Sequence, residues 1–113
     1  MGKQAEKSEP SQPVEQTAVL TTEHILATQN NAKVFVLEVD TSALANGETL
    51  ELYVKSKCLS GGALAIAYSA TYINVQAEPL KISVPIPSDI QAVFTLIQTG
   101  GTGRDYPWKV LSI

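Results

Sequence analysis

The sequence has very few of the residues that carry most metal and nucleophilic chemistry. Its 113 residues include one cysteine, Cys58, and one histidine, His24. A single cysteine cannot form an intramolecular disulfide, and one histidine without further ligands at suitable spacing does not predict a zinc site. No Gly-x-Ser-x-Gly segment is present, and the lone histidine would have to serve any catalytic triad. We therefore expect a non-enzymatic protein with no catalytic, metal or cofactor site.

Positive charge and long apolar runs are scarce as well. The formal net charge is −3, so there is no basic excess that would attract nucleic acid or an anionic membrane surface. The longest apolar run, GALAIAY, is far too short to cross a bilayer. The first ten residues, MGKQAEKSEP, lack the apolar segment of a secretory signal. We expect a protein that is made in a cytoplasm and binds neither nucleic acid nor membrane.

The chain divides into two regions of different composition. Residues 1–17, MGKQAEKSEPSQPVEQT, are mostly polar, with two prolines and no aromatic residue. Such a segment cannot bury enough apolar surface to compensate for the entropy lost on ordering. We predict a flexible polar N-terminal arm over residues 1–17 and a single folded domain over residues 18–113.

Alternation of apolar and polar residues predicts that the domain is built from strands. The clearest pattern lies in residues 48–57, where Leu50, Leu52 and Val54 alternate with polar side chains. Turn residues separate the alternating segments, and no amphipathic helix lies between them. This predicts an all-β fold, a single antiparallel β-sandwich or jelly-roll-like domain. The predicted strands are residues 18–27, 33–40, 48–57, 63–75, 80–86, 91–99 and 107–113.

The predicted strand at residues 63–75 has an unusual composition on one face. Its bulky residues alternate with a row of small ones that includes Ala65, Ala67 and Ser69. Small side chains let another surface approach closely. We therefore take Ala65, Ala67 and Ser69 as candidate residues for a contact between subunits.

The segment TGGTGRDYPW, residues 99–108, is the one stretch that resembles an active-site motif. It lacks the lysine of a phosphate-binding loop and the third glycine of a dinucleotide fingerprint, and too few residues follow it for a crossover helix. We interpret it as a hairpin loop between two strands, with Gly101 or Gly103 in a left-handed conformation.

Two interpretations of the polar and aromatic residues in this segment stay open. In the first, Arg104 and Asp105 form an exposed ion pair of little energetic value, and Trp108 packs in the core. In the second, Arg104 and Tyr106 reach a partner surface, because arginine and aromatic residues are enriched at interface hot spots. The candidate interface residues of this loop are Arg104, Asp105 and Tyr106.

Acidic residues crowd one end of two predicted strands, and they include Glu38, Asp40, Glu48 and Glu51. Their spacing matches neither a calcium loop nor the carboxylate pair of a glycosidase. We predict that they form a solvated acidic face.

Three segments of the chain together resemble a family of small structural proteins of tailed bacteriophages. They are FVLEVDTSALANGETLELYVKSKCLSGG, AYSATYINVQAEPLKISVPIPSDI and TLIQTGGTGRDYPWKVL. The family has an early AxGxTLEL segment and a closing QTxGTGRxxPWKV segment, and the resemblance covers residues 18–113. It implies a virion component, with a capsid decoration (cement) protein as the natural role for this size.

The resemblance carries further expectations about partners and location. Such proteins bind the major capsid protein and sit on the capsid surface as trimers, over threefold or quasi-threefold positions of the shell. Two alternatives stay open at this stage. One is another virion part, such as a tail, spike or head-fibre component. The other is a carbohydrate- or ligand-binding β-sandwich, although aromatic residues make up only 6% of the chain.

Overall fold

The computed structural model describes residues 14–113, which form strands joined by turns and loops, with no helix among them. The all-β prediction is confirmed for this part of the chain. The strands are β1 (Glu15–Thr17), β2 (His24–Gln29), β3 (Lys33–Asp40), β4 (Thr49–Ser56), β5 (Ala65–Ile73), β6 (Leu80–Ile82), β7 (Ile86–Ser88), β8 (Ala92–Thr99) and β9 (Asp105–Ser112).

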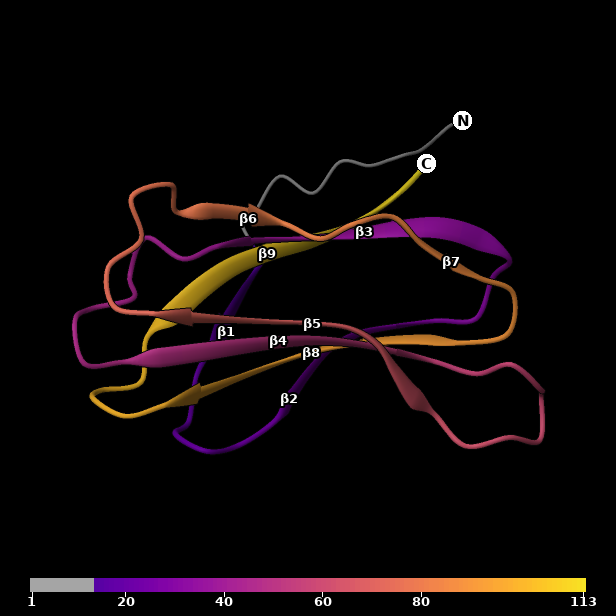
Figure 1. The fold of residues 1–113 in the computed structure, drawn as a ribbon, viewed down its shortest axis with the longest axis horizontal. Helices are drawn as coiled ribbons and strands as arrows, with labels where there is room; N and C mark the ends of the chain where they lie inside the picture. The colour runs from indigo at the N-terminus through magenta and orange to yellow at the C-terminus, as the bar shows by residue number, and fades with distance from the viewer. Residues whose placement is uncertain (1–13) are drawn as a thin grey trace.

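The strands form two antiparallel sheets that face each other in a sandwich-like arrangement (Figure 1). One sheet has the order β1-β9-β3-β6, with β7 also paired to β3, and the other has the order β2-β8-β4-β5. Of the strands that follow each other in sequence, only β4 and β5 pair directly. The chain therefore crosses repeatedly from one sheet to the other, and most of its loops connect the two layers.

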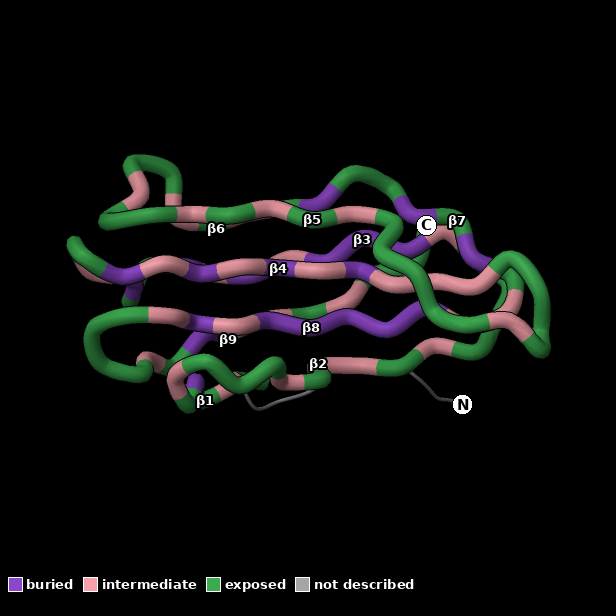
Figure 2. The backbone as a smooth tube through the Cα atoms, turned by 60° about the horizontal axis from the view of Figure 1, so that its bottom comes forward, coloured by how far each residue is buried: buried purple, intermediate pink, exposed green. Residues whose placement is uncertain are grey.

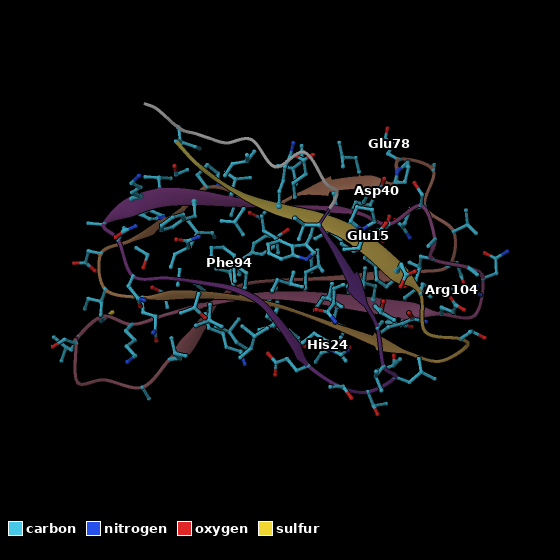
Figure 3. The ribbon with its side chains drawn as sticks, turned by 180° about the vertical axis from the view of Figure 1, so that it is seen from behind. Glu15, His24, Asp40, Glu78, Phe94 and Arg104 are labelled. Carbon is cyan, nitrogen blue, oxygen red and sulfur yellow. The ribbon has the colours of Figure 1, made fainter. Side chains whose placement is uncertain are left out.

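The hydrophobic core lies between the sheets and uses the faces that alternation predicted for residues 33–40 and 48–57, but not for residues 80–86, where Leu80, Ile82 and Val84 are exposed and Ser83 is buried. Phe94 of β8 is fully buried between the two layers (Figure 3). Its ring packs edge to face against Phe35 of β3, with 6.0 Å between the ring centroids. This contact joins the two sheets, and such pairs add stability beyond the burial of their area. The other buried residues of the cluster include Leu37, Val39, Leu50, Leu52, Val54, Leu96 and Tyr106.

Two predicted strands differ from the structure for identifiable reasons. The strand predicted at residues 18–27 begins only at His24, because the chain first turns at Thr21, whose φ is 63°. The strand predicted at residues 80–86 is divided into β6 and β7. Pro85 has no N–H to donate, and Ser83 between them bonds to Leu37 through both its N–H and its hydroxyl oxygen.

The predicted arm falls mostly outside the described residues, which begin at Val14. Its last three residues form β1, which pairs with β9, Glu15 lying opposite Pro107. The backbone N–H of Trp108 also donates to the carbonyl of Val14 at 3.0 Å. The end of the predicted arm is thus part of the five-stranded sheet.

Candidate functional site

The glycine-rich segment connects the two sheets and is not the tip of a hairpin. It begins at the end of β8, which pairs with β2 and β4, and leads into β9, which pairs with β1 and β3. Gly100 and Gly101 are left-handed, with φ of 78° and 68°, so the prediction for Gly101 is confirmed. Gly103 is not left-handed, but a Cβ atom there would collide with the backbone carbonyl of Ala18.

Glu48 and Arg104 form an ion pair that holds this loop in place, and the arginine contacts both oxygens of the carboxylate. Arg104 Nη2 lies 2.8 Å from Glu48 Oε2, and Arg104 Nε donates to both carboxylate oxygens at 3.1 Å. The carboxylate also accepts hydrogen bonds from the backbone N–H groups of Ala45 and Thr102. Glu48 is only 2% exposed. The bonds from Arg104 lower the pKa of Glu48 to about 2, against the opposing effect of burial.

Gln98 holds the same loop from the core side. Its side-chain amide nitrogen donates to the carbonyls of Gly100 and Thr102, and its amide oxygen accepts from the backbone N–H of Arg104. The oxygen also accepts the hydroxyl proton of Tyr106 at 2.8 Å. Gln98 is fully buried, and all four bonds are internal. The protein itself thus supplies the partners of the Gly100 and Thr102 carbonyls and of the Thr102 and Arg104 N–H groups.

The loop residues selected as contact candidates have different environments. Tyr106 is fully buried, and burial raises its pKa to about 12, so its ring belongs to the core and not to a surface. Arg104 lies at one end of the domain (Figure 3). Its ionic partner is Glu48, so the interpretation in which it pairs with Asp105 is wrong. Asp105 is exposed and accepts a hydrogen bond from the hydroxyl of Thr17. Trp108 is half-buried against the core cluster.

Glu48 is the residue that sequence reasoning misplaced. It was grouped with a solvated acidic face, but it is buried, whereas Glu38 and Asp40 are half-buried at the sheet surface. Its partner Arg104 lies 56 residues further along the chain. Local sequence gives no signal for that pairing, because Glu48 directly follows a turn at Asn46 and Gly47 that is typical of exposed loops.

The small-residue strand is an edge strand whose small side chains are exposed. β5 pairs with β4 and with no other strand of the described chain. Ala65, Ala67 and Ser69 are all exposed, and β5 contains no buried residue, whereas β8 in the same sheet is buried along most of its length (Figure 2). The prediction that they share one face is wrong, because the bulge at Ala67 puts Ala65 and Ser69 on opposite sides of the sheet. All three are accessible to another molecule, but the contact itself stays a prediction.

The five-stranded sheet has an outer face that carries exposed apolar residues, which the sequence pattern had not separated from the core. Leu111 of β9 lies opposite Val36 of β3, and Ile82 of β6 lies opposite Glu38 of β3. Leu80, Ile82, Val84 and Leu111 are all exposed, and Ile82 is 58% exposed. We call these four residues with Val36 the outer apolar face.

The remaining chemical groups of the described residues do not converge on a second site. His24 Nε2 accepts the backbone N–H of Val19 at 2.9 Å, so it helps to close the turn before β2. No group of three His, Cys, Asp or Glu side chains in residues 14–113 lies close enough together to hold a metal ion. No helix in the part of the chain that the structure describes is long and apolar enough to cross a membrane.

Comparison of the chain with protein-family models, with curated proteins and with solved structures finds no match in any of the three.

Proposed function

We propose that the protein is a non-enzymatic structural component of a tailed-phage particle, a capsid decoration protein that binds the assembled head shell and stabilises it. The proposal includes a jelly-roll-like domain with an N-terminal arm, synthesis in the host cytoplasm and a final position on the capsid surface. The major capsid protein is the proposed partner. The family resemblance over residues 18–113 supports this role and a trimeric arrangement on the shell.

The outer apolar face is the observation that carries the proposal. Exposed apolar side chains on a sheet surface lose contact with water when a second surface covers them, which contributes about 25 cal/mol per Å² buried. Leu80, Ile82 and Leu111 are contributed by β6 and β9, on either side of β3. Exposed apolar residues gathered on one face of a sheet are typical of a protein-protein contact.

An ion pair lies on this same face, because Glu38 of β3 is opposite both Ile82 of β6 and Lys109 of β9, and it suits a contact that must be specific as well as apolar. Lys109 Nζ lies 3.8 Å from Glu38 Oε2, and the side chain of Lys109 is 60% exposed. A polar rim around an apolar centre is the usual composition of a non-obligate interface. Many copies bound to one lattice can together stabilise a shell even when each single contact is weak.

Binding to particles that lack the protein tests the proposal. Wild-type protein should co-sediment with such particles in saturable amounts and raise the temperature at which they release their genome. Ile82→Asp should reduce the bound amount strongly, because it places a second carboxylate on the outer apolar face, opposite Glu38. Ile25→Asp is the matched control: Ile25 is 65% exposed, but it lies on β2 of the other sheet.

Two outcomes would contradict this function. Wild-type protein that fails to bind any particle, at concentrations where it remains folded, would reject the decoration role. Loss of binding in Ile25→Asp but not in Ile82→Asp would reject the outer apolar face as the contact.

The carbohydrate-binding alternative receives no support from the aromatic residues. Such sites present aromatic rings as exposed platforms for sugars. All seven aromatic residues of the chain lie in the described part, and each is buried or half-buried.

A further inference from the structure

The edge of β5 is the longest unpaired strand edge in the described chain. Each sheet ends in two edges, and the other edge strands are β1, β6 with β7, and β2. β5 has nine residues, whereas β2 has six and β1, β6 and β7 have three each. Apart from the ladder with β4, none of the described backbone hydrogen bonds involves residues 65–73. Every second residue there directs its N–H and C=O away from β4, and the only one of these groups that the structure shows with a partner is the C=O of Ile73, which accepts a hydrogen bond from Gln76 Nε2.

Three of the four other edge strands carry a charge or a proline that discourages pairing with a further strand. The fourth, β2, has no Asp, Glu, Lys, Arg or Pro, but it is three residues shorter than β5 and has a bulge between Ile25 and Ala27. Lys81 lies on β6, Pro87 on β7 and Glu15 on β1, and charges, prolines and short length are the usual protection of an edge. No charged residue and no proline occurs in residues 58–77. The one protective feature of β5 is a bulge at Ala67, where the register with β4 shifts. Residues 68–72 are therefore a regular, uncharged and open edge.

We infer that β5 pairs with β5 of a second copy of this chain, antiparallel and about a twofold axis. In a twofold contact each residue faces residues of its own segment, so a charged edge would repel itself. An uncharged edge is free of that repulsion. The pairing joins the four-stranded sheets of two copies into one continuous sheet and satisfies the open backbone groups of both.

The side chains favour a register in which the twofold axis passes between the Ala70 residues of the two copies. Residues directly opposite each other must point to the same side of the sheet. The axis must therefore pass between two copies of the same residue, and not between neighbouring residues. With Ala70 on the axis, Ser69 faces Thr71 of the partner subunit, and Tyr68 faces Tyr72 of the partner subunit. Hydroxyl pairs and aromatic pairs are both favourable opposite each other on neighbouring strands. Tyr72 is already held on its own subunit by Lys81, whose Nζ lies 4.9 Å from the ring centroid.

This contact does not depend on the proposed decoration role, because it forms between copies in free solution. It also differs from the expected trimer, since a twofold contact produces pairs. On a shell it would join one trimer to a neighbouring one. The oligomeric state of the purified protein therefore tests it separately from shell binding.

Charged substitutions at Ser69 and Thr71 test both the contact and its register. Both residues are exposed on the outer side of β5, so neither change disturbs the core. Ser69→Lys with Thr71→Lys places like charges opposite each other twice and should weaken the dimer about tenfold or more. Thr71→Lys with Ser69→Glu (the Lys/Glu variant) places opposite charges face to face and should preserve the dimer, and in both double variants the lysine that replaces Thr71 stays opposite Glu51 of its own chain. Thr28→Lys, an exposed change on β2 at the far edge of the same sheet, is the control.

Sedimentation equilibrium at tens of micromolar, with circular dichroism to verify folding, provides the measurement. We expect dimers for the wild type, for Thr28→Lys and for the Lys/Glu variant, and dissociation for the Lys/Lys variant. A monomeric wild type, or a trimer that the Lys/Lys variant dissociates, would overturn the twofold contact. Dissociation of both double variants would overturn the register, because an axis at residue 69 or 71 places like charges opposite each other in each of them.

Discussion

The β8–β9 loop and the β5 edge differ in whether their backbone N–H and C=O groups have hydrogen-bond partners within the chain. In the loop, buried Gln98 and Glu48 bond to four backbone groups at Gly100, Thr102 and Arg104, so these groups have partners within the chain. On β5, one side of the strand pairs with β4 and the other side has no partner in the described chain. The loop has the residue types of a contact motif, but its hydrogen bonds to Gln98 and Glu48 are internal. The alanine-rich strand β5 is the one with an edge that has no partner strand in the described chain.

The difference indicates that a contact surface is better recognised by unsatisfied groups than by residue type. Arginine, tyrosine and tryptophan are enriched at hot spots, and the loop has all three. Here Tyr106 is buried and Arg104 neutralises a buried carboxylate. The following predictions test this contrast, in order of decreasing expected effect on the stability of the monomer.

Removal of the buried carboxylate should have the largest effect. Glu48→Ala leaves Arg104 without its partner and leaves two backbone N–H groups of the loop without an acceptor. We expect a loss of about 3 kcal/mol in the free energy of unfolding, at the low end for a broken buried pair because Arg104 is partly solvated. Chemical denaturation measures the loss. Glu78→Ala, at an exposed carboxylate, is the control and should change stability by less than about 0.5 kcal/mol.

Gly101→Ala should cause the next largest loss in the free energy of unfolding. The left-handed backbone costs an alanine about 1–2 kcal/mol, and the added Cβ would collide with the Glu48 side chain, which the ion pair holds in place. Gly61→Ala is the matched control, since nothing lies within 4 Å of the added carbon there. Equal denaturation midpoints for the two variants would contradict the packing of the loop against Glu48.

Acid should weaken the loop selectively. The pKa of Glu48 is lowered from 4.5 to about 2 on folding, so its ionised form stabilises the protein above pH 4.5. That contribution is lost as the pH falls from 4.5 towards 2, when the unfolded chain takes up the proton first. The pKa values of Glu23 and Asp40 are lowered as well, by bonds from Lys55 and Thr95 and from Ser42, so part of the acid sensitivity belongs to them.

Melting temperatures of the wild type and of Glu48→Gln between pH 2 and pH 6 provide the test. The variant should melt at a lower temperature near neutral pH, and its melting temperature should fall less on acidification. Parallel curves for the two proteins would show that Glu48 titrates at its ordinary value.

The smallest effect on the monomer is expected at the β5 edge. Ser69→Lys with Thr71→Lys changes two exposed side chains that pack on nothing in the core, so the free energy of unfolding of the monomer should change by less than about 0.5 kcal/mol. Denaturation at a protein concentration below dimer formation measures it. A large loss would mean that β5 contributes to the fold of the single chain and is less available for pairing than its open edge indicates.

Comparison of the predicted and observed contact candidates shows what local pattern reveals. Ala65, Ala67 and Ser69 were selected for their small size, and they are exposed on an edge strand. Arg104 and Tyr106 were selected by residue type, and both have internal partners in Glu48 and Gln98. The outer apolar face escaped prediction because Leu80 and Ile82 alternate with polar residues in the same way as core residues do.

Local pattern was enough to predict most of the strands and the buried faces of β3 and β4, but not β1, which falls in the predicted arm, nor the burial of β8 on both faces. Period-two alternation is a local property, since successive side chains of a strand point to opposite sides. Only the tertiary structure decided that β8 and β9 lie in different sheets, that Glu48 meets Arg104 and that β5 ends a sheet. Strand pairing depends on contacts between residues far apart in the chain, so the same alternation is compatible with a hairpin, with a crossing between sheets and with an open edge.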